Sequence, residues 1–166
     1  METRYLKRMA HFNDMSVEDL AAALPAGALI GLDLGSRTIG VAASDSGQRI
    51  ASGVETIRRK KMRDDAARLV DICTERDAVA IVLGLPLNMN GTEGPRVQAT
   101  RAFRRNLAPY TDLPVTFWDE RLSTVAAERA MLEGDMSRKR RGEVIDKVAA
   151  VVILQSLLDR LSSLRV

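Results

Sequence analysis

The sequence is poor in the residue types that form disulfides and soft metal sites, with one cysteine, Cys73, and one histidine, His11, among 166 residues. A single cysteine excludes an internal disulfide and a CxxC-type zinc site, and a single histidine excludes a His-rich metal centre. No apolar run approaches the ~20 residues of a membrane helix, and the first 25 residues lack the apolar segment of a secretory signal. Catalysis must therefore use carboxylates, hydroxyls, Lys, Arg or backbone groups, and we expect a cytoplasmic protein with no membrane partner.

The composition is that of a globular chain, with 46% hydrophobic and 28% charged residues. The length suits one compact domain. Residues 1–26 read as an N-terminal extension with one short helix, capped by Ser16 and stopped by Pro25. We therefore expect a single domain over residues 27–166.

The positive charge is concentrated, although the net charge is only +3. Nine of the 25 Lys and Arg residues form two short clusters, which are Arg58, Arg59, Lys60, Lys61 and Arg63, and Arg138, Lys139, Arg140 and Arg141. Such clusters are typical of proteins that bind a phosphate backbone. A solvated basic loop is the alternative for either cluster alone.

The order of apolar segments predicts an α/β fold. Strands are expected at 28–34, 39–44 and 49–57, joined by short turns as an antiparallel meander. Helices are then expected from 62, from about 92 to 107, from 124 to 134 and from 143 to about 161, with strands at 78–83 and 115–118. Residues 135–142 read as a basic loop. This order predicts a mixed five-stranded sheet, three strands antiparallel and two parallel, with helices on both faces.

Acidic residues stand at three unusual places. Asp33 interrupts an otherwise apolar strand, where an ion needs a partner or a metal. Asp119 and Glu120 follow a short strand, and strand alternation lets only one of them point at a given site. Asp146 shares a helix face with four apolar residues, which are Ala149, Ala150, Ile153 and Leu157. Each acid alone also has an ordinary structural explanation.

Together the acids predict a metal site, because a central first strand, its neighbour from 115 and the last helix can bring Asp33, Asp146 and one of the pair 119/120 together. Close carboxylates repel unless a cation compensates their charge. Oxygen-only ligands indicate Mg²⁺ or Mn²⁺. Such a site suits phosphodiester hydrolysis, with two ions about 3.5–4 Å apart when substrate is bound.

Four segments resemble the signatures of the YqgF/RuvX family. They are DLGSRTIGVA at 33–42, GLPLNMNGTE at 84–93, DERLST at 119–124 and IDKVAA at 145–150. The resemblance spans about residues 28–160 and implies a ribonuclease H-like nuclease, described as a Holliday-junction resolvase and as a pre-16S rRNA nuclease acting at the 5′ end during ribosome maturation. It also resolves the choice between Asp119 and Glu120, because Glu120 matches the family's second acidic motif. The implied catalytic and metal-binding residues are Asp33, Glu120 and Asp146.

The same resemblance suggests roles in nucleic-acid binding. Arg37, with the hydroxyls or amides of Ser36 and Thr38, would steady a phosphate, and Asn88 and Thr92 would shape the rim of the cleft. The basic loop Arg138, Lys139, Arg140 and Arg141, with Arg101 on its helix face, would hold backbone phosphates without sequence choice. Precursor rRNA is the preferred partner, in ribosomal particles or free.

Three other functions stay open from the residues alone. A branched-DNA resolvase would use the same chemistry, normally as a two-fold dimer. A non-catalytic RNA-binding assembly factor would keep the fold without the reaction. An actin-like ATPase also uses an Asp-x-Gly hairpin, but 166 residues supply only one of the two domains that it needs.

Overall fold

The computed structural model describes residues 15–135 and 138–166, and its side chains outside 134–143. The helices are α2 Val17–Ala23, α3 Met62–Glu75, α4 Pro95–Leu107, α5 Val125–Asp135 and α6 Arg138–Leu164, with 3-10 turns η1 Ala108–Tyr110 and η2 Glu120–Leu122. The strands are β1 Ala28–Leu34, β2 Thr38–Ser44, β3 Ala51–Arg58, β4 Ala78–Leu85 and β5 Val115–Asp119. Ser16 caps α2 through its hydroxyl, as its sequence predicts.

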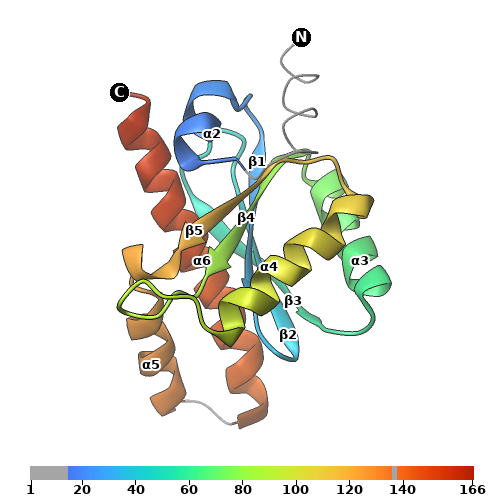
Figure 1. Ribbon diagram of the computed structural model, residues 1–166, viewed down its shortest axis with the longest axis vertical. Coiled ribbons are helices and arrows are strands. Elements are labelled where there is room, and N and C mark those ends of the chain that lie inside the picture. Colours follow the sequence, from blue (N-terminus) through green and yellow to red (C-terminus); the bar gives the residue numbers. More distant parts are fainter. Residues whose placement is uncertain (1–14, 136–137) are drawn as a thin grey trace.

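The five strands form one mixed sheet in the order β3-β2-β1-β4-β5. β1, β2 and β3 pair antiparallel, and β4 pairs parallel with both β1 and β5. The expected mixed five-stranded sheet is therefore confirmed, with β1 at its centre. The expected pairing of the strand from 115 with the first strand is wrong, because β4 lies between β1 and β5. Because β1, β4 and β5 run in one direction, their carboxyl ends share one edge of the sheet, and the turn into β2 lies at the same edge (Figure 1).

Several element boundaries differ from the expected ones, and the starts of three elements differ most. β3 begins at Ala51 rather than residue 49. α4 begins at Pro95 with Gly94 as its N-cap, because the Thr92 hydroxyl donates to Asn90 Oδ1 and keeps Thr92 in the preceding loop. The expected basic loop is wrong, since the backbone from Arg138 is already helical and continues into α6 without a break. Residues 138–164 contain no proline and many strong helix formers, which explains the longer helix.

Alternation along β1 divides the core into two layers. Leu29 packs with Ala149, Ala150 and other α6 residues on one face, whereas Ile30 and Leu32 pack toward α3 and α4 on the other. Figure 1 shows α6 running along one face of the sheet, with α3 and α4 on the opposite side. Asp33 lies four residues after Leu29 on the same strand, and alternation points both side chains to the same face. The Asp33 side chain therefore belongs to the α6 face.

Glycines on the α6 face allow the helix to approach the sheet closely. A Cβ built on Gly40 would lie 1.9 Å from the carbonyl oxygen of Asp146, and one on Gly84 would lie 2.6 Å from Ile153 Cδ1. Only a residue without a side chain fits where the helix backbone meets β2. Gly40 therefore sets the position of Asp146 over the sheet.

Within residues 15–135 and 138–166, every helix is too short or too polar to span a lipid bilayer.

Candidate active site

Asp33 and Asp146 are brought together by the contact of α6 with β2. Asp33 is paired across the sheet with Gly40, which is the residue under the backbone of Asp146. Asp33 as a whole residue is 3% exposed, and Asp146 is half-buried beside it. Strand register and one glycine contact are thus sufficient to place a strand carboxylate next to a helix carboxylate.

Glu120 reaches the same place from the end of β5. It is the first residue of η2 and is 7% exposed. Its carboxyl carbon lies 3.4 Å from the position of a Cβ on Gly84, in β4, the strand between β5 and β1. Three elements distant in sequence therefore deliver three acids to the same edge of the sheet.

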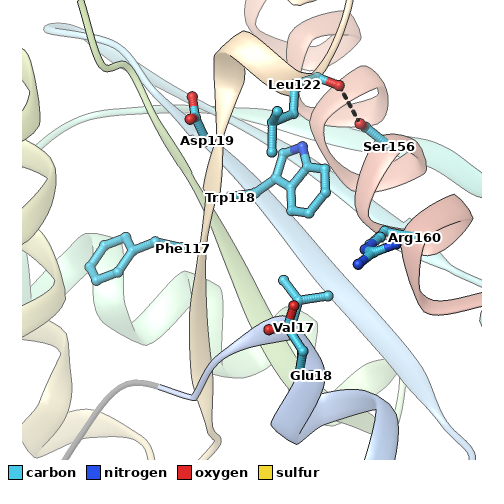
Figure 2. Close-up of a pocket in the computed structure, with 8 residues that line it drawn as sticks. All are labelled: Val17, Glu18, Phe117, Trp118, Asp119, Leu122, Ser156 and Arg160. Carbon is cyan, nitrogen blue, oxygen red and sulfur yellow. Dashed lines mark hydrogen bonds between the residues drawn. The ribbon is translucent and has the colours of Figure 1, made fainter. Parts of the chain in front are cut away.

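Strand alternation in the structure explains why Glu120 and not Asp119 enters this cluster. Figure 2 shows Trp118 on the α6 side of β5, whereas Phe117 and Asp119 point to the other side. Asp119 instead caps η2 by accepting from the Arg121 backbone N–H, and its carboxylate pairs with the Arg121 guanidinium at 2.8 Å. Trp118 is buried in the core. A hollow of about 650 Å³ beside Trp118 is lined by none of the three clustered acids.

A guanidinium from α5 joins the acidic cluster. Nη2 of Arg129 lies 2.6 Å from Asp33 Oδ1 and 3.3 Å from Glu120 Oε1, so one nitrogen donates to two carboxylates. The Thr38 hydroxyl donates to Asp146 Oδ2. The hydroxyl expected to steady a phosphate thus holds a carboxylate in place.

The crowding of acids shifts their proton affinities. Burial, and then the charge of Asp33, raise the pKa of Asp146 to about 6. The same two causes raise the pKa of Glu120. The charges of Arg129 and Arg96 oppose both shifts without cancelling them. Glu120 and Asp146 therefore bind protons more readily than free carboxyl groups do, because burial and the neighbouring charge of Asp33 both disfavour their ionised forms.

The chemistry of this cluster fits a hard divalent cation. All its donors are carboxylate or hydroxyl oxygens, and Asp33 Oδ2 is buried with no hydrogen-bond partner among the described residues. In the described residues no three acidic side chains close around a single point, and Arg129 Nη2 lies between two of them. The three acids could hold Mg²⁺ or Mn²⁺ once this ion pair opens.

Two hollows at the same edge carry positive charge. One of about 620 Å³ is lined by Asn88, Arg96, Glu120, Arg121 and Arg129, among others. A second, of about 480 Å³, lies by Gly35 and Ser36 and is lined by Arg59 and Arg96. Arg96 lines both hollows, so a phosphate chain crossing this edge would meet cations next to Glu120.

The predicted nucleic-acid residues fall at different distances from this edge. Arg37 is exposed in the β1–β2 turn, and Asn88 donates to the Thr92 hydroxyl in the loop between β4 and α4. Arg101 forms an ion pair with Glu93 and lies 5.2 Å from the ring centre of Phe117. Arg138, Lys139, Arg140 and Arg141 begin α6, and their side chains lie outside the described residues. Their roles in binding stay predictions.

The sequence reasoning missed Arg129 and Arg96. A signal for Arg129 exists, because it follows Val125 by four residues and therefore shares the buried face of α5. Arg96 follows Pro95 in the first turn of α4 and gives no periodic signal, since it is exposed. The position of Arg96 near the acids depends on which loops pack beside the start of α4, and only the tertiary fold determines those loops.

The sheet order and the acids at its carboxyl edge define the ribonuclease H-like class of proteins. Two solved structures show the same fold. RuvC of Thermus thermophilus in complex with a Holliday junction substrate gives a TM-score of 0.51 at 11% identity, over 82% of this chain and 97% of that chain. The yeast mitochondrial Holliday junction resolvase Ydc2 gives a TM-score of 0.52 at 11% identity, over 98% of this chain and 94% of that chain.

Residues 27–160 match the model of the family described as "RuvX: Holliday junction resolvase", and the chain belongs to this family of nucleases. Two relatives carry the name "Putative pre-16S rRNA nuclease". The one from Bradyrhizobium sp. is 63% identical over 139 residues, 84% of this chain and 86% of the relative. The one from Cereibacter sphaeroides is 65% identical over 147 residues, 88% of this chain and 92% of the relative. The resemblance found in the four motifs is confirmed.

Proposed function

We propose that this protein is a nuclease, dependent on Mg²⁺ or Mn²⁺, that processes the 5′ end of precursor 16S rRNA. The convergence of Asp33, Glu120 and Asp146 carries the proposal, since three elements bring carboxylates together where only a cation can neutralise them. The name shared by relatives at 63% and 65% identity supports the rRNA substrate over branched DNA.

Each acid has a distinct part in this proposal. Asp33, the most buried, would contact both ions, and Glu120 and Asp146 would each hold one. When bound, the ions supply an activated water and a stabilised leaving oxygen. The Thr38 hydroxyl fixes the Asp146 carboxylate, and the burial of Asp33 and Glu120 keeps competing water away from their oxygens.

The substrate would lie along the carboxyl edge of the sheet. Arg37 in the β1–β2 turn and Asn88 and Thr92 in the loop before α4 would contact it there, and Arg101 would contribute after release from Glu93. Arg138, Lys139, Arg140 and Arg141 would hold phosphates along the start of α6. Such contacts give affinity, whereas RNA shape gives selectivity. Processing of rRNA implies a cytoplasmic location and binding to ribosomal particles.

The test uses the Asp33→Asn variant, with Asp71→Asn as a matched control because Asp71 is exposed on α3. Each protein is incubated with Mn²⁺ or EDTA and with either a 5′-extended 16S rRNA fragment or a four-way DNA junction. We expect the wild type and D71N to shorten the RNA in Mn²⁺ only. D33N should lose about a thousandfold in rate, the effect of several kcal/mol of lost transition-state stabilisation, and still bind the RNA.

The other outcomes separate the alternatives. Cleavage of the junction but not the RNA would identify a branched-DNA resolvase. RNA binding without cleavage by any protein would identify an assembly factor. Full activity of D33N would remove Asp33 from the site.

A further inference from the structure

The Nη2 atom of Arg129 lies where a cation shared by two carboxylates would lie. Its distances of 2.6 Å to Asp33 Oδ1 and 3.3 Å to Glu120 Oε1 place it between the two most buried acids of the site. The side chains are 22%, 4% and 7% exposed for Arg129, Asp33 and Glu120. The contact is therefore largely shielded from water and specific to these partners.

This ion pair leaves the acidic site incompletely satisfied. Asp33 Oδ2 has no hydrogen-bond partner among the described residues, although it is buried. Within the same residues, only Nη2 of the Arg129 guanidinium donates to the acids. A guanidinium has five N–H groups and can form bidentate contacts with a carboxylate. A structural arginine in an optimised pair would use more of its donors.

We infer that Arg129 is a built-in counter-cation that occupies the acidic site in the metal-free protein and must leave before a divalent ion binds. This inference rests on the proposed metal-dependent function. Ion and guanidinium compete for the same oxygens of Asp33 and Glu120, and their positive charges repel each other. Arg129 therefore lowers the apparent affinity for metal and prevents the empty site from holding three unneutralised carboxylates.

The structure provides a place for the displaced side chain. Arg129 already lines the hollow of about 620 Å³ that also contains Arg96, Arg121 and Asn88. Val125 anchors the start of α5 in the core, so a rotation of the Arg129 side chain suffices and the helix need not move. In this hollow the guanidinium would face the substrate phosphates, which are the anions available once metal holds the carboxylates.

The test compares Mn²⁺ binding to wild-type protein, Arg129→Gln and Arg68→Gln by titration calorimetry, with thermal unfolding measured in EDTA. Arg68 is the matched control because it also contacts two carboxylates, Glu55 and Glu75, at the surface. Gln keeps most of the length of the side chain and removes its charge. We expect R129Q to bind Mn²⁺ about tenfold more tightly, the size expected for loss of one competing charge-assisted contact, and R68Q to bind as the wild type does.

The metal-free form should respond in the opposite way, because R129Q leaves three acids without their counter-cation. It should unfold at a lower temperature than the wild type in EDTA and gain more from saturating Mn²⁺. If R129Q does not fold without metal, Arg129→Lys replaces it, with a smaller gain in affinity because one ammonium reaches both acids less well.

Each result bears on the inference. Equal or weaker Mn²⁺ binding by R129Q, while the wild type binds Mn²⁺ and cleaves RNA, overturns the role of Arg129 and leaves the proposed function intact. Binding by R129Q but not by the wild type supports it strongly. Absence of binding to every protein rejects the inference, and RNA cleavage assayed in parallel shows whether the nuclease proposal fails too.

Discussion

Both faces of the sheet bury apolar side chains, but the face under α6 also carries acids at one edge, where Asp33 and Glu120 meet Asp146 of the helix. The face under α3 and α4 gains stability from each buried residue. The face under α6 combines glycine contacts, which bring the α6 backbone down on the sheet, with like charges that oppose folding. Both faces therefore supply stability, and the α6 face uses part of it to hold a reactive arrangement.

Among substitutions that test the difference between the two faces, we expect the largest effect on stability and activity from Gly40→Ala on the α6 face. The new Cβ would overlap the carbonyl oxygen of Asp146, so α6 must shift away from β2. We expect a loss of more than about 3 kcal/mol in unfolding free energy, measured by urea denaturation, and a loss of nuclease activity because Asp146 moves. Gly53→Ala is the control, since its Cβ would meet only the flexible Lys147 side chain at 3.0 Å or beyond. Equal effects of both substitutions would contradict the role given to Gly40.

A smaller effect is expected on the apolar face from Ile72→Val. Ile72 is fully buried in α3, and removal of one methylene leaves a small cavity. The unfolding free energy should fall by about 1 kcal/mol. Nuclease activity per folded molecule should stay unchanged, because Ile72 packs on the face of the sheet opposite to the acidic cluster. A clear fall in the catalytic rate of the folded fraction would show that the two faces are coupled.

The comparison also shows which features the sequence could predict. The strands themselves follow from apolar runs and turn residues, and alternation within β1 already places Asp33 apart from Ile30 and Leu32. Their full order does not, because β4 and not the strand from 115 pairs with β1. Local pattern failed at the start of α6, because a run of cations is compatible with both a helix and a loop. It also failed at the start of α4, expected near residue 92, because the Thr92 side chain bonds to Asn90 in the preceding loop.

The candidate site was predictable in its acids but not in its cations. Asp33 and Asp146 stand out because burial of a charge is unusual, whereas Glu120 needed the family resemblance to be separated from Asp119. Arg129 shares its face with one buried residue, Val125, which is a weak signal among many exposed arginines. Its partners are 96 and 9 residues away, so the contact depends on the packing of α5.

The charged face should also give a pH dependence that the apolar face cannot give. Burial and Asp33 raise the pKa of Asp146 from 3.8 to about 6, so the native state binds this proton more tightly than the unfolded chain. The stability of the metal-free protein should therefore fall as pH rises from about 4 to about 6, with the raised pKa of Glu120 acting in the same sense. Denaturation midpoints of the wild type and Asp146→Asn in EDTA test this across that range. A pH profile that is identical in the two proteins would contradict the shift.

The smallest effect concerns the cations beyond the acids, at the start of α6. Replacement of Arg138, Lys139, Arg140 and Arg141 by Ala should weaken RNA binding at low salt and lower the slope of log affinity against log salt, by about 0.7 per lost contact with single-stranded RNA. Arg49 and Arg76 form the control, because both are exposed at the opposite edge of the sheet, before β3 and after α3. Their replacement should leave the slope unchanged if substrate follows the edge that holds the acids. If the salt slope falls equally in both variants, RNA binds by net charge alone. If the slope falls only in the control variant, the RNA lies at the opposite edge of the sheet.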